Sequence, residues 1–231
     1  SARVRTEDGA VLTDLLDRAP RVSYKRSGLN VMVTVDSAMC SSDGRPSVLR
    51  LRTTFEYRWG YIKIHREFTG QAATLRLFEL CPLSVILSPG LTDYGYRAGV
   101  SEDESAPPFD FGSNLWGKLR PGVPDDHPLE TNFVPRSMIL VNPGVEGLEW
   151  FSGDDLAQWE LGPAGQRGHG RCSLSLSQNP PGLALTISPY WADDQATAIV
   201  PPAASASSCS FDFYLAFPLL EGHAFKPWLH R

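Results

Sequence analysis

The sequence lacks the features that would assign a function class directly. No apolar run approaches the roughly 18–20 residues that a membrane-spanning helix needs, and the longest, Leu80–Leu87, contains Pro82 and fits a buried strand. No Gly-x-Ser-x-Gly, phosphate-binding glycine motif, His-x-x-x-His pair or Asn-x-Ser/Thr glycosylation acceptor occurs. The four cysteines are far apart and form no Cys-x-x-Cys pair. Because zinc sites need clustered ligands, we expect no metal and no organic cofactor.

An excess of positive charge is also missing. The chain has 21 Lys and Arg against 26 Asp and Glu, which gives a formal net charge of -5. A mildly acidic chain lacks the long-range attraction to phosphate on which nucleic-acid binding depends. The one basic stretch, Arg18–Arg26, is short and interrupted, and it fits a solvated strand edge or loop. We therefore predict neither nucleic acid nor a membrane as a partner.

What is present is strand patterning. In Val48–Phe68, apolar and polar side chains alternate on both sides of the turn Arg58-Trp59-Gly60, as a half-buried antiparallel hairpin requires. Leu75–Leu87 fits a long strand with a bulge near Phe78, because its alternation shifts there. Further alternating segments are expected to be strands: Ser137–Val141, Gly147–Phe151, Cys172–Ser177, Leu183–Ser188 and Cys209–Phe217.

The fold class follows from these strands. Helix signals are few: Val11–Ala19 fits a short helix or a strand, and Asp154–Trp159 fits a single turn. With 19 Pro and 20 Gly between the strands, the sequence predicts one all-β domain over 1–231, a large antiparallel, supersandwich-like β-sandwich. Cys172 and Cys209 are in phase with the apolar face, and either free thiols or a bridge between them fits the pattern.

Residues 101–135 depart from this pattern. They contain six prolines, little periodicity and the aromatic residues Phe109, Phe111, Trp116 and Phe133. A loop this long in a compact domain is uncommon, and its aromatic content argues against disorder. We expect it to fold back over the sheet or to contact a partner, with Trp116, Phe109 and Phe111 at the contact.

An acidic and aromatic segment supplies the candidate binding site. Between 141 and 160, Glu146, Glu149, Asp154, Asp155 and Glu160 accompany Trp150 and Trp159. Sugar sites pair aromatic faces with carboxylates, so Trp150, Trp159 and Trp116 are candidate substrate-binding residues. A carboxylate pair can also hydrolyse a glycoside, and Glu149 with Asp155 is the best local pair. The alternative is that the tryptophans fill the core and the carboxylates lie on turns.

A second pair of candidate catalytic residues follows the last predicted strand. Glu221 and His223 could form an acid–base couple, or they could belong to a polar turn. The acidic groups Glu102-Asp103-Glu104 and Asp125-Asp126-His127 lack the spacing of a calcium loop and are expected to be solvated.

Three segments resemble the N-terminal β-sandwich of proteins related to glycoside hydrolase family 123. They are Val141–Glu160, which contains Gly-Leu-Glu-Trp-Phe, the strand Phe211–Leu220 and the hairpin Arg50–Phe68. The resemblance implies a carbohydrate context and a separate catalytic barrel. Because that family holds its catalytic carboxylates in the barrel, the resemblance assigns no catalytic residue to this chain. The region 91–135 has no counterpart in the family.

Three functions are therefore open. The first is an accessory β-sandwich of a glycoside hydrolase that packs on a catalytic domain or partner subunit. The second is a free-standing glycosidase or epimerase that uses the carboxylates or the His/Glu pair. The third is a structural interaction domain. The start at Ser1 without a methionine favours the first, as expected of a processed or excised domain, and we expect a cytoplasmic location unless a leader was removed.

Overall fold

The structure of the chain is a computed structural model. The described residues are 1–6, 8–58, 60–70, 77–87, 93–97, 116–118, 130–131, 137–142, 146–152, 169–178, 181–191, 208–217, 220–221 and 224–225. Their helical content is one 3-10 turn, η1 (Asp14–Leu16). None of them belongs to a helix long and apolar enough to cross a membrane.

Strands occur in both halves of the chain. In the first half they are β1 (Arg3–Thr6), β2 (Val11–Thr13), β3 (Arg21–Ser27), β4 (Asn30–Cys40), β5 (Pro46–Arg58), β6 (Tyr61–Thr69), β7 (Leu77–Cys81), β8 (Leu83–Leu87) and β9 (Asp93–Arg97). In the second half they are β10 (Trp116–Lys118), β11 (Glu130–Thr131), β12 (Ser137–Asn142), β13 (Glu146–Ser152), β14 (His169–Gln178), β15 (Pro181–Trp191), β16 (Ser208–Ala216), β17 (Leu220–Glu221) and β18 (Ala224–Phe225).

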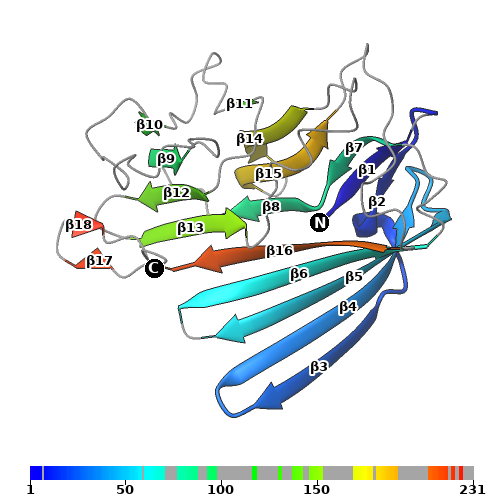
Figure 1. Cartoon of the computed structure of the whole chain (residues 1–231), viewed down its shortest axis with the longest axis horizontal. Coiled ribbons are helices and arrows are strands. Elements are labelled where there is room, and N and C mark those ends of the chain that lie inside the picture. The colour runs from blue at the N-terminus through cyan, green and yellow to red at the C-terminus, as the bar shows by residue number, and fades with distance from the viewer. Residues whose placement is uncertain are drawn as a thin grey trace.

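Sixteen of these strands form one antiparallel sheet, which curls so that its two halves enclose a common core (Figure 1). The main path runs β10-β9-β12-β13-β16-β6-β5-β4-β2-β1-β7-β15-β14-β11, with β3 beside β4 and β8 beside β15. The strands β17 and β18 pair separately. The predicted all-β antiparallel fold is confirmed, and the two predicted layers are the two halves of this continuous curled sheet.

The core lies between the two halves of the sheet. From one half come side chains such as Phe68, Trp150 and Phe213, and from the other come side chains such as Leu80 and Ile187. All five are at most 1% exposed. Aromatic side chains bury large apolar areas, so these contacts supply much of the stability.

The predicted hairpin over Val48–Phe68 is confirmed as β5 and β6. The turn contains Gly60 at φ 83, a conformation that glycine adopts without strain. The other predicted strands are also confirmed, as β12 to β16. The segment Val11–Ala19, for which a helix or a strand fitted equally, forms the short strand β2 followed by the single turn η1.

The strands β1, β4, β9, β17 and β18 were not predicted from the sequence, and two predicted segments differ in detail from the structure. Leu75–Leu87 does not form one strand: it is divided at Pro82 into β7 and β8, because proline has no N–H to give to a ladder. The expected irregularity at Phe78 is present, since Arg5 pairs with Glu79 and Thr6 with Leu77. Within the predicted loop 101–135, β10 and β11 are short strands.

Three of the four cysteines have described side chains. Cys40, Cys81 and Cys172 are buried and form no disulfide. The Cys172 thiol is therefore not in a bridge, and burial raises its pKa above the ordinary value. The predicted turn at Asp154–Trp159 lies outside the described residues.

Candidate functional site

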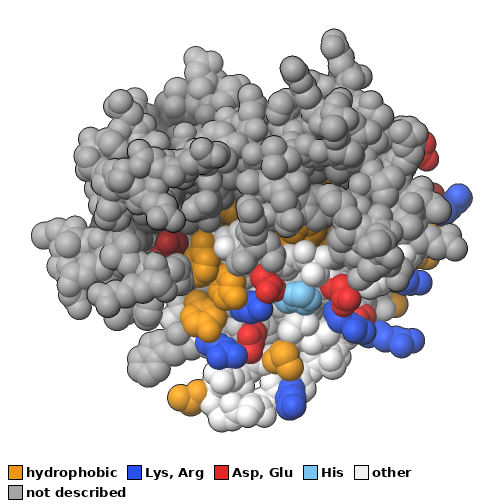
Figure 2. All heavy atoms as spheres, viewed as in Figure 1, with side chains coloured by type: hydrophobic (Ala, Val, Ile, Leu, Met, Phe, Trp, Pro, Cys, Tyr) orange, Lys and Arg blue, Asp and Glu red, His pale blue; other side chains and the backbone are white. Residues whose placement is uncertain are grey.

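One face of the strands β3, β4, β5, β6, β16 and β13 carries polar side chains where the other face carries the core. Alternation explains this, because Arg52, Thr54 and Glu56 point away from the core while Leu51 and Thr53 point into it. In the view of Figure 2, acidic and basic side chains lie side by side on the described part of the surface, with hydrophobic side chains beside them. We call the face opposite the core the polar face.

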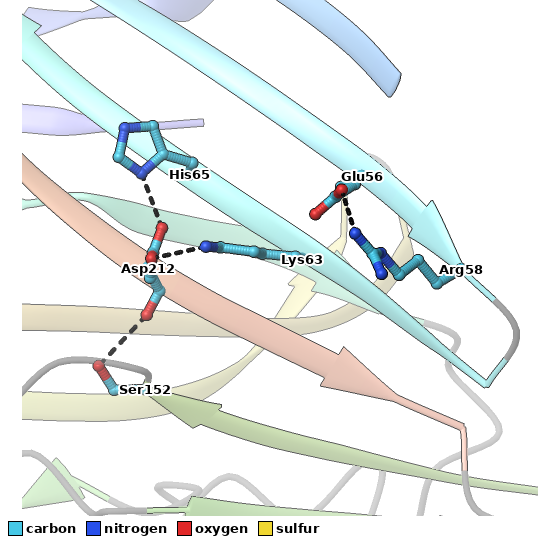
Figure 3. A network of polar contacts seen from close by, with 6 residues as sticks. All are labelled: Glu56, Arg58, Lys63, His65, Ser152 and Asp212. Atoms are coloured by element: carbon cyan, nitrogen blue, oxygen red, sulfur yellow. Dashed lines mark hydrogen bonds and ion pairs between the residues drawn. The ribbon is translucent and has the colours of Figure 1, made fainter. Parts of the chain in front are cut away.

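The register of β6 and β16 brings a carboxylate and two basic groups together on the polar face. His65 is paired with Asp212, and Lys63 with Tyr214. The Nδ1 atom of His65 lies 2.7 Å from Oδ1 of Asp212, and the Nζ atom of Lys63 lies 2.8 Å from Oδ2 (Figure 3). Each carboxylate oxygen therefore has its own partner, which orients the carboxylate.

These contacts set the charge state of the cluster. Partial burial raises the pKa of the Asp212 carboxyl, but the hydrogen bonds from Lys63 and His65 outweigh it, so this pKa lies below its ordinary value. The hydrogen bond to Asp212 raises the pKa of the Lys63 ammonium. Asp212 and Lys63 are therefore both charged at neutral pH, and Asp212 is an acceptor of hydrogen bonds rather than a donor of protons.

Three aromatic rings lie beside this cluster. The rings of Phe151 and Tyr214 are stacked with centroids 4.7 Å apart and an interplanar angle of 1°. Tyr61 lies on the other side of Tyr214 at 6.0 Å, tilted by 53°. The Nζ atom of Lys63 is 5.8 Å from the centre of the Tyr214 ring. All three rings are partly exposed. We call Phe151, Tyr214 and Tyr61 the aromatic row.

A groove continues the polar face toward β3. Its volume is about 710 Å³. Three carboxylates and three guanidinium groups line it, from Asp17, Asp36, Glu67, Arg21, Arg50 and Arg52. Arg52 and Asp36 form an ion pair of 2.7 Å across β5 and β4. The groove therefore offers hydrogen-bond donors and acceptors with balanced charge.

Together these groups suit the binding of a polar molecule that also has apolar faces. Partly exposed rings present flat apolar surface, and the ion-paired carboxylates beside them accept hydrogen bonds from hydroxyl groups. Glu56 accepts a hydrogen bond of 2.6 Å from Arg58 at the end of this face (Figure 3). Within the described ranges, no three His, Cys, Asp or Glu side chains are grouped so that they could hold a metal ion.

The candidate site residues that were selected from the sequence do not belong to the Asp212 cluster or the aromatic row. Glu149 lies on β13 opposite Ala216 and is only 3% exposed. Trp150 is fully buried, with its ring 6.1 Å from that of Phe213, so it occupies the core position that was the alternative to sugar binding. In this position its ring presents no surface to a ligand.

Five of the candidates have side chains outside the described part of the chain. Asp155, Trp159 and His223 lie outside the described residues altogether. Glu221 is placed on β17 and Trp116 on β10 by their backbones. The pairs Glu149–Asp155 and Glu221–His223 therefore stay predictions.

The residues that the structure brings together were missed by the sequence analysis. Asp212 is 147 residues from His65 in the chain, so only the pairing of β16 with β6 makes them neighbours. One signal was present in the sequence. Asp212 lies between Phe211 and Phe213 in an apolar strand, on the same face as Tyr214. A charged residue at such a central position of an apolar strand is a candidate for function.

Comparisons with known proteins assign no family. No protein-family model matches the sequence, and no curated protein matches it. Among solved structures, the chain is similar to the Slr1438 protein from Synechocystis sp. PCC 6803, with 8% identity and a TM-score of 0.45. The match covers 86% of this chain and 65% of Slr1438, so the chain spans less than two thirds of that protein. The resemblance to the glycoside hydrolase family 123 sandwich stays a prediction.

Proposed function

We propose that this chain is a non-catalytic carbohydrate-binding domain that accompanies a catalytic domain or partner subunit of a carbohydrate-active enzyme. The observation that carries the proposal is the aromatic row beside the Asp212 cluster. Sugar rings have apolar C–H faces and polar rims, and binding sites match them with aromatic rings and fixed hydrogen-bonding groups. Tyr214 lies at the centre of the row and directly beside Lys63, so a bound sugar would contact both kinds of group.

The charge state of Asp212 supports binding rather than catalysis. A glycosidase needs one carboxyl with a raised pKa as general acid. The Asp212, Glu56 and Asp36 carboxylates on the polar face each have a basic partner at 2.6–2.8 Å. For Asp212, the hydrogen bonds from Lys63 and His65 hold the pKa below its ordinary value, so this carboxylate is ionised, accepts hydrogen bonds and gives no proton.

Binding is tested by titrating the purified chain with a panel of neutral, uronic-acid-containing and sulfated oligosaccharides in a calorimeter. The variant Tyr214→Ala removes the central ring, and a ring contact of about 1–1.5 kcal/mol corresponds to roughly tenfold weaker binding. Tyr24→Ala is the matched control, because it removes an exposed ring of the same chemistry from β3. The absence of binding across the panel, or equal loss in both variants, would refute the proposal.

The accessory role has its own test. The isolated chain is expected to show no glycosidase activity. If it turns over a glycoside, and if Glu149→Ala or Asp155→Ala abolishes that turnover without unfolding the protein, the role is catalytic.

The hydrogen bond between His65 and Asp212 favours a second candidate function, proton transfer by a sugar-processing enzyme. A carboxylate that binds Nδ1 fixes the orientation of an imidazole, which leaves Nε2 for the substrate. The groove, which is lined on β6 by Glu67 two residues from His65, would then hold the sugar. Loss of an epimerase or isomerase activity in His65→Gln, with sugar binding retained, would establish this candidate.

A further inference from the structure

The strand β3 forms an open edge of the sheet. It pairs with β4 and with no other described strand, and all seven of its residues are exposed. In Figure 1 the hairpin β3–β4 extends away from the body of the molecule, with β3 on its outer side. An open edge offers unpaired N–H and C=O groups to another strand.

The register shows which backbone groups are free. A two-residue turn follows Ser27, which makes Ser27 and Asn30 a hydrogen-bonded pair. Hydrogen-bonded and non-hydrogen-bonded pairs alternate from there along an antiparallel ladder. The N–H and C=O groups of Val22, Tyr24 and Arg26 therefore point to the open edge.

Two of these residues, Val22 and Tyr24, continue the apolar face of the sheet beyond the core. The pairings Tyr24–Val33, Val33–Phe55, Phe55–Ile64 and Ile64–Phe213 place five side chains in one cross-strand row. Phe213 is fully buried and Ile64 is 4% exposed, whereas Tyr24 is 81% exposed. Val22, two residues away on the same face, is 65% exposed. A further strand would cover these side chains.

The positive charge of β3 indicates which kind of strand would bind at this edge. Arg21, Lys25 and Arg26 give β3 three positive charges, and the strand has no acidic residue. Arg26 donates to the carbonyl of Gly28, while Arg21 and Lys25 form no ion pair with the residues that the structure describes. A second copy of β3 would bring six cations together, which is unfavourable for opposite residues in a sheet. An acidic strand is complementary.

We propose that β3 is a docking edge for an acidic, extended segment of another polypeptide, which adds to the sheet as an antiparallel strand. Acidic residues of the segment face Arg21 and Lys25 on the polar face. Apolar residues face Val22 and Tyr24 on the other face, and an acidic residue faces Arg26. This inference does not rest on the proposed sugar site, since it uses the open edge of β3 rather than the aromatic row, although Arg21 also lines the groove of the polar face.

The pairing defines a probe peptide. The probe peptide is Thr-Glu-Glu-Val-Thr-Val-Glu, capped at both ends and labelled with a fluorophore. It runs antiparallel to β3, so its first residue lies opposite Ser27 and its last opposite Arg21. Its affinity for the full chain is measured by fluorescence anisotropy. One control peptide has lysine in place of glutamate, and another has the same residues in scrambled order. Tighter binding of the probe than of both controls is expected, because only the probe matches charge and alternation together.

Two protein variants test the geometry. Tyr24→Pro removes an N–H that points to the open edge and leaves the ladder with β4 intact, so it should abolish binding while circular dichroism is unchanged. Tyr24→Thr is the matched control that keeps the N–H. The double variant Arg21→Glu/Lys25→Glu should bind the acidic probe about tenfold more weakly or worse and the lysine peptide more tightly.

The outcomes are decisive in both directions. Binding that Tyr24→Pro abolishes, and whose charge preference the double variant reverses, supports the docking edge. No binding at millimolar peptide, equal binding of the scrambled peptide, or undiminished binding to Tyr24→Pro overturns it. A dimer of the chain in sedimentation that Tyr24→Pro dissociates would also overturn it, because the occupant would then be a second copy.

Discussion

The guanidinium group of Arg66 is buried on the core side of the sheet. Among the described residues, Asp14 is its one ion-pair partner. The Arg66 side chain is 4% exposed, and its Nη1 lies 3.5 Å from Oδ2 of Asp14. Burial lowers the pKa of Arg66, and the Asp14 charge opposes that shift. The other carboxylate oxygen accepts a hydrogen bond of 2.8 Å from the N–H of Ala2. Asp14 therefore fixes η1 to the sheet and compensates a buried charge.

We predict that Asp14→Ala lowers the free energy of unfolding by about 3 kcal/mol. Breaking a buried ion pair by removing one partner costs roughly 3–5 kcal/mol, because the other charge stays buried. The lower end applies, since Asp14 is 17% exposed. In an Arg66→Met background the same change loses the hydrogen bond to Ala2, about 1 kcal/mol. The expected coupling between the two sites is the difference, about 2 kcal/mol.

The four proteins of this cycle are compared by urea unfolding followed through tryptophan fluorescence, with linear extrapolation to water. Distant sites add to within about 0.5 kcal/mol. If Asp14→Ala costs the same in both backgrounds within that limit, the ion pair does not compensate the guanidinium, and the reasoning is refuted.

Two further predictions concern the polar face and a turn. The pKa of Asp212 is lowered in the folded state, so its contribution to stability is present above the ordinary pKa of about 4 and is lost as the pH falls through the folded value. Asp212→Asn should therefore flatten the acid limb of the melting temperature against pH, and an unchanged limb would contradict this. Gly70 has φ 126, and a Cβ there would lie 2.4 Å from the Val48 carbonyl oxygen. Gly70→Ala should thus destabilise by more than about 1 kcal/mol, measurably more than the control Gly44→Ala, whose Cβ meets nothing within 4 Å.

Local patterning was sufficient to predict β5 to β8 and β12 to β16, which is half of the strands, but it missed β1, β4 and β9 and did not predict which strands pair outside hairpins. The hairpin β5–β6 could be predicted because alternation continues on both sides of Gly60. The break at Pro82 was missed because the apolar run continues through it, although proline lacks the N–H that a continuous ladder needs.

The candidate site was less accessible to sequence reasoning than the fold. Trp150 and Glu149 were selected as neighbours in the sequence, yet neighbours on a strand point to opposite faces. Trp150 accordingly lies in the core. His65 and Asp212 come from strands 147 residues apart, and their contact depends on a register that no local pattern specifies. The fold class could therefore be predicted from the sequence, whereas the contact between His65 and Asp212 could not.

The position of β16 between β6 and β13 has a consequence for synthesis on the ribosome. The strands β3 to β6 are consecutive hairpins, so they can pair as soon as they leave the exit tunnel. The core contacts of Ile64 and Phe68 with Phe213 and Phe211 cannot form at that stage, because these two partners are translated more than 140 residues later. Pairings at such sequence separation form slowly and leave apolar surface exposed in the interval. The apolar side chains at this edge of β6 therefore stay exposed on the nascent chain until β16 has been translated.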